Sequence, residues 1–350
     1  MFGLGRPKAL VGLDIGSSSV KAVELRKKGT SYELVNLGIE PLGQDTVVDG
    51  AIMDALSVSS AIEKIFNENS IKIKNVATSV SGHAVIVKRV TVSATKEEEL
   101  RSAIPYEAQQ HIPFDMTDVN LSYQVLGPTV NGSGTDVMLV AVKREKILNH
   151  TNVLMQAGKI PTVVDYDGFA VYNAFEVNYD RAADQVAALL NIGASIMNIV
   201  IGRGGTPLFT RDISVGGNQY TDTLQKELDL SFDDAERLKQ GFEVPNLTQD
   251  QTLPHLRSVS EILLLEIQKT FDFFRQTASS ENIQHIYVSG GTAKIMGLVD
   301  QLTAEFNLPV EIINPLQRVL IDPTKFDVAY LDQIAARMSV AVGLALRSFD

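Results

Sequence analysis

Residues 9–26 read Ala-Leu-Val-Gly-Leu-Asp-Ile-Gly-Ser-Ser-Ser-Val-Lys-Ala-Val-Glu-Leu-Arg, and this stretch decides the fold. Two apolar runs flank a turn of glycine and serine, and the second run alternates apolar and polar side chains from Val20 to Leu25. Alternation is typical of a half-buried strand, and small residues between two such runs are typical of a tight turn. The stretch therefore predicts a β-hairpin near the N-terminus.

A second stretch repeats this pattern in the other half of the chain. Residues 186–201 read Val-Ala-Ala-Leu-Leu-Asn-Ile-Gly-Ala-Ser-Ile-Met-Asn-Ile-Val-Ile, so that 190–195 align with 13–18. Both stretches have an apolar strand, an acid or amide, Ile-Gly, small residues and another apolar strand. Two similar hairpins in opposite halves suggest a duplicated fold with a pseudo-twofold axis.

The segment between the two hairpins contains a further compact unit. Residues 87–160 show a strand, a helix that we expect to begin at Thr95 and stop near Pro113, two strands and a second helix. This order is αββα-like or βαββα-like, and we interpret it as an inserted subdomain. Further along the chain, the apolar spacing predicts a polar loop over 245–254 and a long helix over 258–278.

The composition excludes several classes of protein. The 350 residues carry 31 Lys and Arg against 42 Asp and Glu, and the net charge of -11 argues against nucleic acid as a partner. The absence of cysteine excludes disulfides and thiol catalysis, and the five histidines lack the spacing of metal ligands. The N-terminus has no signal-peptide pattern, and no apolar run approaches the ~18 residues of a membrane span. We therefore expect a soluble cytoplasmic protein.

The first hairpin turn has the composition of an anion site. Gly16 allows a ligand to approach the backbone closely, the three serines that follow add hydroxyl donors, and the N–H groups of such a turn favour an anion. Lys21 can add a cation, and Asp14 is placed to hold Mg²⁺ through water. A phosphate and metal site is one interpretation. An ordinary Gly/Ser turn, in which Asp14 accepts from turn amides, is the other.

Two later segments offer further places for a ligand. Gly193, Ala194 and Ser195 form a second small turn, but Asn191 stands where the first hairpin has its acid. The segment 289–293 reads Ser-Gly-Gly-Thr-Ala between an expected strand and helix, where a glycine pair lets a base or phosphate lie against the backbone. Neither a Walker P-loop nor a dinucleotide-binding glycine motif is present.

The order of these three pieces resembles the superfamily of ATPases that contains actin, Hsp70 and the sugar kinases. The resemblance implies an α/β actin-like ATPase fold, in which two lobes, each built on a ribonuclease-H-like mixed sheet, close on Mg-ATP. It implies that 14–21 form the first phosphate loop, 191–195 the second, and 289–293 the adenosine motif. Two connecting helices would contain 165–171 and 341–344.

A narrower resemblance covers essentially the whole chain. The segments that carry it are Val80-Ser81-Gly82-His83, His111-Ile112-Pro113-Phe114-Asp115, Asp165-Tyr166-Asp167-Gly168-Phe169-Ala170, Gly216-Gly217-Asn218 and Ala235-Glu236-Arg237-Leu238-Lys239. They resemble the PilM family, cytoplasmic actin-like proteins of type IV pilus assembly that are related to the division protein FtsA. Within the wider superfamily resemblance, Glu236 and Lys239 look like the pair that contacts the ribose and base.

Together the two resemblances assign a set of residues to ATP, and to Mg²⁺ held through water by Asp14. The set is Asp14, Gly16, Ser17, Ser18, Ser19, Lys21, Asn191, Gly193, Ala194, Ser195, Gly216, Gly217, Glu236, Lys239, Gly290, Gly291 and Thr292.

The resemblance also implies a division of the chain into subdomains. The expected parts are the first lobe (IA) at 1–86, the inserted subdomain (1C) at 87–160, a return to IA with a connecting helix at 161–185, the second lobe (IIA) at 186–217, subdomain IIB at 218–284, and IIA with the C-terminal connecting helix at 285–350.

The family resemblance implies partners as well as a cofactor. In the PilM family, the groove beside the inserted subdomain binds the cytoplasmic N-terminal tail of the membrane protein PilN; here we expect it near His83 and around Pro113 to Asp115. Contact with PilO would be indirect, and contact with assembly ATPases is possible. The resemblance implies a cytoplasmic protein peripheral to the inner membrane, held there only through partners.

The chain departs from the superfamily pattern at Asn191, which cannot supply the charge of the usual second aspartate. Asp167 falls roughly where Hsp70-like relatives carry a glutamate, and it is the candidate for orienting a water molecule. A carboxylate at this position can equally cap a helix. We therefore expect ATP binding, with hydrolysis weak or absent, and leave enzymatic activity undecided.

Two other functions are compatible with the same fold. A small-molecule kinase of the superfamily needs a carboxylate base in the cleft, and Asn191 stands where one would be expected. An FtsA-like division filament usually ends in an amphipathic membrane helix, and no such extension follows Gly343 here. Vesicle binding or phosphorylation of a sugar would favour these alternatives.

Overall fold

The first sheet grows out of the N-terminal hairpin. Its strands, in spatial order, are β10 (Ile160–Tyr166), β6 (Asn75–Val80), β1 (Val11–Ile15), β2 (Ser19–Lys28), β3 (Ser31–Pro41) and β16 (Val319–Leu320). β1, β2 and β3 are antiparallel, whereas β6 and β10 run parallel to β1. The computed structural model describes residues 9–129, 132–180, 184–278 and 281–349.

The second sheet repeats this topology. Its order is β13 (Thr206–Ile213), β12 (Met197–Arg203), β11 (Val186–Ile192), β14 (His285–Ser289) and β15 (Val310–Ile312). β11, β12 and β13 are antiparallel, and β14 and β15 run parallel to β11. Each sheet therefore contains a three-stranded meander and two parallel strands beside it, and β16 adds a sixth strand to the first sheet. The shared five-stranded pattern is the duplication that the two hairpins predict.

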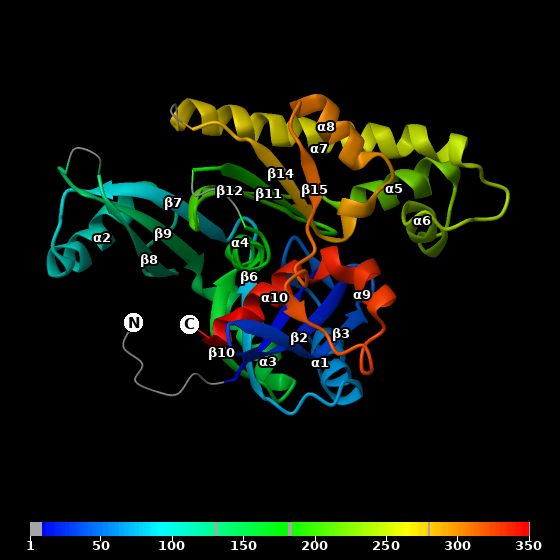
Figure 1. Ribbon diagram of the computed structural model, residues 1–350, viewed down its shortest axis with the longest axis horizontal. Coiled ribbons are helices and arrows are strands. Elements are labelled where there is room, and N and C mark those ends of the chain that lie inside the picture. The colour runs from blue at the N-terminus through cyan, green and yellow to red at the C-terminus, as the bar shows by residue number, and fades with distance from the viewer. Residues whose placement is uncertain (1–8, 130–131, 181–183, 279–280, 350) are drawn as a thin grey trace.

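Two helices separate the sheets at the centre of the molecule (Figure 1). α4 (Asp167–Asn178) follows β10, and α10 (Ser339–Leu346) lies near the C-terminus. They contact each other, while α10 packs on β1 and β2 and α4 on β11 and β12. A Cβ atom on Gly343 would lie 1.8 Å from the Ala170 carbonyl oxygen, so the two helices touch backbone to backbone. This is the place where the resemblance puts the connecting helices.

Other helices cover the outer faces of the two sheets. On the first sheet these are α1 (Ala55–Glu68) and α3 (Arg144–Gln156), with the small hairpin β4 (Val47–Val48) and β5 (Ala51–Ile52) beside them. On the second sheet they are α5 (Gly217–Leu228), α6 (Phe232–Lys239), α7 (Gln249–Thr277) and α8 (Leu298–Phe306). Short helical segments complete the chain: η1 (Gly291–Lys294), α9 (Val328–Ile334), η2 (Ala335–Met338) and η3 (Arg347–Phe349).

A separate three-stranded sheet stands to one side of the two lobes (Figure 1). It contains β7 (Val85–Val92), β9 (Thr135–Lys143) and β8 (Val119–Pro128), and α2 (Glu97–His111) covers it around its own small core. α3, which the sequence groups with this unit, contacts α1 and β10 of the first lobe. The subdomain boundaries stay a prediction, and this packing favours an end to the inserted unit before α3.

Two local expectations about helix starts are wrong. α2 begins after Lys96, and no side chain caps it, so Thr95 is not its cap. α7 begins at Gln249 rather than at 258, because Thr248 and Gln251 form a capping box there.

The segment Val328–Phe349 is long and apolar enough, by composition alone, to span a membrane, but 67% of its most apolar window is buried inside the molecule. We therefore interpret that segment as a core helix.

Candidate functional site

The first hairpin turn carries a buried ion pair at its base. Asp14 in β1 faces Lys21 in β2 across the strand pair, and Lys21 Nζ lies 2.9 Å from Asp14 Oδ2. Both side chains are about one-tenth exposed. A Cβ on Gly16 would lie 3.1 Å from Lys21 Nζ, so a glycine keeps the turn close to this charged pair. The residues predicted for phosphate and metal therefore do lie together.

The serines of the turn differ in exposure. Gly16 N–H donates to the Ser19 carbonyl oxygen at 3.1 Å, which closes the turn. Ser17 is partly buried and Ser18 is exposed. Ser19 is the first residue of β2 and is 1% exposed, and its hydroxyl has no hydrogen-bond partner in the described part of the chain.

The second hairpin turn is attached to the start of α5. The Gly193 carbonyl oxygen accepts from Gly217 N–H and from the Thr292 hydroxyl, both at 2.9 Å. The Ala194 carbonyl oxygen accepts from Asn218 N–H at 2.8 Å. A Cβ on Gly216 would lie 2.6 Å from the carbonyl oxygens of both turn residues, so the close approach requires glycine there. Three sequence motifs thus meet at one point.

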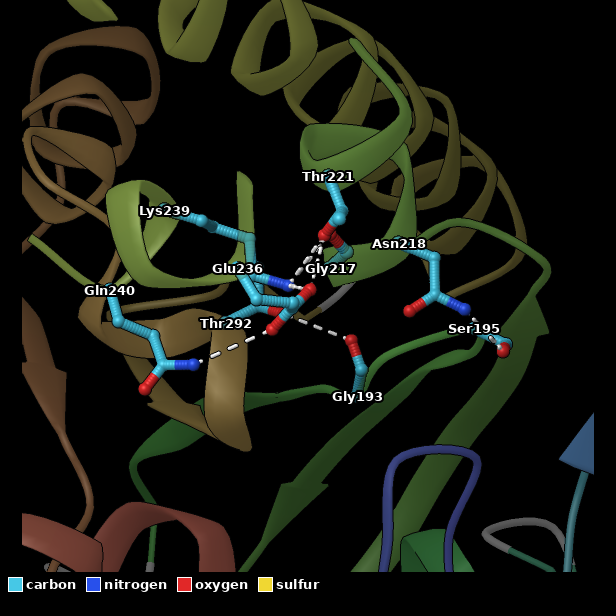
Figure 2. Close-up of polar contacts among 9 residues, drawn as sticks. All are labelled: Gly193, Ser195, Gly217, Asn218, Thr221, Glu236, Lys239, Gln240 and Thr292. Carbon is cyan, nitrogen blue, oxygen red and sulfur yellow. Dashed lines mark hydrogen bonds and ion pairs between the residues drawn. The ribbon is translucent and has the colours of Figure 1, made fainter. Parts of the chain in front are cut away.

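A polar wall stands beside this turn (Figure 2). Lys239 Nζ donates to the Thr221 hydroxyl at 2.8 Å and pairs with Glu236, which also accepts from Thr221. Burial lowers the pKa of Lys239, and the adjacent Glu236 carboxylate opposes that shift. Gln240 extends the wall by donating to Glu236 at 3.5 Å. Glu236 and Lys239 therefore form a pair, as the resemblance implies, and lie on the same side as Gly217 and Thr292.

The segment after β14 brings backbone to the same place. Gly290 has a φ of +90°, and a Cβ on it would lie 2.2 Å from the Ile192 carbonyl oxygen. Gly290 N–H donates to the Ala336 carbonyl oxygen at 2.8 Å. Gly291 differs, because its Cβ would meet only the Arg337 side chain, at 3.9 Å, and it is exposed. Gly290 thus serves the fold, whereas Gly291 leaves open space for a ligand.

Carboxylates from both lobes gather at the inner ends of the sheets. Asp167 opens α4, and burial, followed by the nearby charge of Asp14, raises its pKa to about 6. The hydroxyls of Ser79 and Ser81 oppose the shift, while Asp212 from the second lobe adds to it. An acid whose pKa lies close to neutrality can exchange a proton at working pH.

Several residues of this region were not identified from the sequence. Asp212 in β13 accepts from Tyr166 O–H at 2.5 Å, from Gly82 N–H at 2.6 Å and from Asn198 Nδ2 at 2.9 Å. Burial raises the pKa of Asp212, and these donors oppose the shift. Asn198 follows Asn191 by seven positions, as Lys21 follows Asp14, so the repeat itself contained a signal for it.

A lysine from α3 also reaches this region without having been predicted. Lys146 Nζ donates to the Gly50 carbonyl oxygen at 2.7 Å. Burial lowers its pKa, whereas the charges of Asp167, Asp212 and Asp49 raise it. No sequence motif pointed to this residue, because its position depends on how the helix packs.

The arrangement offers oxygen ligands but no closed metal cage. Within residues 9–129, 132–180, 184–278 and 281–349, no group of three or more histidine or acidic side chains could hold a metal ion by itself. Mg²⁺ usually takes only one or two carboxylates and fills its other positions with water and phosphate oxygens. The first hairpin turn, with Asp14 at its base, fits that kind of ion.

The comparisons with known proteins agree with this geometry. A solved structure of a "PilM-PilN type IV pilus biogenesis complex" matches with a TM-score of 0.87 and 28% identity, over 98% of this chain and 99% of that one. MreB 5 of Spiroplasma citri, solved with AMPPNP, matches with a TM-score of 0.50 and 15% identity, over 95% of this chain and 94% of that one. The cell division protein FtsA of Streptococcus pneumoniae serotype 2 (strain D39 / NCTC 7466) is 22% identical over 96% of this chain and 82% of its own length.

These likenesses confirm the actin-like ATPase fold, with two lobes built on similar mixed sheets. The family model for the type IV pilus assembly protein PilM matches residues 12–349, which is nearly the whole chain. The chain therefore belongs to the PilM family of type IV pilus assembly proteins.

Proposed function

We propose that this chain is a cytoplasmic adaptor of type IV pilus assembly that binds Mg-ATP between its two lobes and docks the cytoplasmic tail of a PilN protein. The observation that carries the nucleotide part is the meeting of four motifs. The Gly193 turn, the Gly217 end of α5, Thr292 and the Glu236–Lys239 pair are joined by hydrogen bonds at one point. No single motif would distinguish a nucleotide site from an ordinary glycine turn.

Each part of the site has a role that its chemistry suits. The turn amides at 16–18 and 193–195 would hold phosphates. Asp14 would hold Mg²⁺ through water, with Lys21 balancing its charge. The base would lie over the exposed backbone at Gly291, and Lys239 and Glu236 would contact the ribose. Bound Mg²⁺ supplies charge neutralisation for the phosphates.

Hydrolysis would depend on Asp167. Its raised pKa, to which the nearby Asp14 charge contributes, suits proton exchange with a water molecule. Asn191 provides no second carboxylate beside the second turn. We expect ATP to bind more readily than it is hydrolysed, so that the nucleotide acts mainly by changing the angle between the lobes.

The PilN tail would dock where the inserted sheet meets the first lobe. Half-buried apolar side chains from both units line this junction: Val87, Val140, Ile147, Val164 and Phe169. A pocket of about 230 Å³ continues from it past His83 to β13. Phe114, the other predicted position, packs on the core of the inserted unit beneath the Lys143 ammonium. The junction at His83 is therefore the better candidate.

The test is a binding experiment with two ligands. Calorimetry with Mg-ATP should show saturable binding to one site, and phosphate release under single-turnover conditions should be slow or absent. A synthetic PilN tail peptide should then bind with a different affinity in the presence of saturating Mg-ATP. Absence of ATP binding would overturn the nucleotide part. Absence of peptide binding, with or without ATP, would overturn the adaptor part.

A further inference from the structure

A row of polar side chains crosses the second sheet from one side to the other. Ser289, Asn191, Asn198 and Asp212 lie on four adjacent strands and are register partners, so they share one face of the sheet. The Ser289 hydroxyl donates to Asn191 Oδ1 at 3.1 Å, Asn191 Nδ2 to Asn198 Oδ1 at 2.8 Å, and Asn198 Nδ2 to Asp212 Oδ1 at 2.9 Å. We call these four residues the ladder.

The direction of the ladder follows from the charge at its end. An ionised carboxylate only accepts, so Asn198 must present its NH₂ group to Asp212 and its oxygen to Asn191. Asn191 must then present its own NH₂ group, and its oxygen is left for Ser289. Every donor points toward Asp212, and hydrogen bonds polarised in one direction strengthen one another.

The acidic end of the ladder belongs to a contact between the lobes. Asp212 stands in the second lobe, but it accepts from Tyr166 O–H at 2.5 Å and from Gly82 N–H at 2.6 Å, both in the first lobe. Tyr166 is 3% exposed. Lys146, also outside the second lobe, adds a positive charge nearby. We call the Asp212, Tyr166 and Gly82 contact the clasp.

The other end of the ladder belongs to the glycine segment. Ser289 directly precedes Gly290, and Gly290 is fixed against β11 by its close approach to the Ile192 carbonyl oxygen. Asn191 and Ile192 are neighbours in that strand. A displacement of the glycine segment would therefore move both partners of the first hydrogen bond in the ladder.

We propose that the ladder and the clasp work together. The ladder holds the Asp212 carboxylate in place so that it joins the lobes, and a displacement of residues 289–291 moves the ladder and thereby alters the clasp. The joining of the lobes stands on the hydrogen bonds alone. Only the response to ATP rests on the proposed function.

The ladder explains the asparagine at position 191. An aspartate there could not donate to Asn198. Asn198 would have to reverse so that it donated to position 191, and its oxygen would then face the Asp212 carboxylate. Two acceptors in contact cost free energy, and a buried carboxylate that loses a donor costs more. Asparagine at position 191 thus allows Asn198 to keep donating to the ionised Asp212 carboxylate of the clasp.

The separation of the lobes can be measured with two spin labels. Because the chain has no cysteine of its own, introduced cysteines are the only residues that a thiol-reactive label modifies. Lys72→Cys in the first lobe and Glu305→Cys on α8 are both exposed and accept spin labels. Pulsed electron paramagnetic resonance then gives the distribution of distances between the lobes. Three changes are compared in this background: Tyr166→Phe, which removes one clasp hydroxyl; Asn191→Asp, which is isosteric; and Asn191→Ala, in case the aspartate does not fold. Asn152→Asp, at an exposed asparagine on α3 of the first lobe, is the matched control.

Without nucleotide, we expect a single distance for the unmodified protein and a second, longer population for Tyr166→Phe and for Asn191→Asp, with no change for Asn152→Asp. An unchanged distribution for Tyr166→Phe would overturn the clasp. A longer population for Tyr166→Phe but for neither variant of Asn191 would overturn the ladder as its support.

The response to ATP is tested in the same labelled background with Asn198→Ala added, which breaks the ladder at a residue outside the set assigned to ATP. Mg-ATP should shift the distance in the unmodified protein, and the shift should be lost in Asn198→Ala while calorimetry still shows binding. A shift that persists in Asn198→Ala would overturn the transmission. If calorimetry shows no ATP binding at all, the proposed function fails, and the measurements without nucleotide still decide the clasp.

Discussion

Asp14 and Asn191 occupy equivalent places in the two sheets but make different pairs. Asp14 faces Lys21 in an ion pair, whereas Asn191 faces Asn198 in a pair of amides. Charge is therefore concentrated in the first hairpin, where a divalent cation is expected. The second hairpin is neutral and is tied to its surroundings by hydrogen bonds.

Removal of the Asp14 charge should weaken binding of Mg-ATP. In Asp14→Asn, the metal loses its carboxylate, and a charged contact of this kind is worth about 1.5–3 kcal/mol, or roughly tenfold or more in Kd. Calorimetry should show the loss with Mg²⁺ and a much smaller one with EDTA. Asp300→Asn, an exposed acid on α8, is the control. Equal affinity for Mg-ATP in Asp14→Asn and the unmodified protein would exclude Asp14 as the metal's ligand.

Asp167 should make stability depend on pH. Burial raises the pKa of Asp167 from its ordinary value of 3.8 to about 6 in the folded protein, so between these pH values the folded state binds the extra proton. The penalty for ionising it is absent below about pH 4 and complete above about pH 6, where it is on the order of 3 kcal/mol at most.

Asp167→Asn removes that penalty. The variant should unfold at a higher urea concentration than the unmodified protein at pH 7.5, and the difference should vanish near pH 4. Asp300→Asn should show no such pH-dependent gain. A variant less stable at pH 7.5 would mean that the carboxylate makes interactions worth more than its burial costs.

At the scale of elements, Gly291, the first residue of η1, differs from Gly290, the residue before it, in backbone conformation and in the space around it. Gly290 has a backbone conformation that favours glycine and no room for a side chain, whereas Gly291 has both an ordinary conformation and open space. A single Gly-Gly motif thus contains one residue that the fold requires and one that, in the proposed function, lies against the ligand.

This difference predicts opposite phenotypes. Gly291→Val should fold normally but prevent nucleotide binding, because the added methyl groups would occupy the place of the base. Gly290→Ala should lower the free energy of unfolding by about 2 kcal/mol or more, since it combines a positive φ with a clash. Urea denaturation and calorimetry on both variants decide the matter. Normal ATP binding by Gly291→Val would remove the base from this position.

At the scale of the whole molecule, α4 and α10 pack against each other between the two lobes, α10 on the first sheet and α4 on the second. Their contact at Gly343 and Ala170 has no space for even one methyl group. Gly12 in β1 makes a similar approach, with its Cβ position 2.1 Å from the Ala341 carbonyl oxygen. The centre of the molecule is thus built from small residues so that helices and strand can meet by their backbones.

Gly343→Ala should therefore destabilise the entire fold. Alanine favours a helix over glycine by about 1 kcal/mol, so any loss arises from the contact, and we expect a net loss of about 2 kcal/mol or more. Thermal unfolding should show one transition at a lower temperature. Gly43→Ala, whose Cβ would meet an atom no closer than 3.5 Å, is the control. Equal stability of the two variants would show that the helices can separate without cost.

Most of the fold could be predicted because its signals are local. The hairpins β1–β2 and β11–β12 both follow from apolar spacing and small turn residues. The expectations that failed, at Thr95 and at 245–254, concern helix starts, where several capping residues compete and only one forms its hydrogen bonds.

By itself, the sequence determined the duplicated architecture, the PilM family and the positions of the glycine motifs, because each is written in short contiguous stretches. Only the tertiary structure showed that Asp212 joins Tyr166 and Gly82, which lie 46 and 130 positions away along the chain. A single aspartate in a strand belongs to no sequence pattern from which its hydrogen-bond partners could be predicted. Its role arises from the closeness of two sheets, and packing of the whole chain sets that distance.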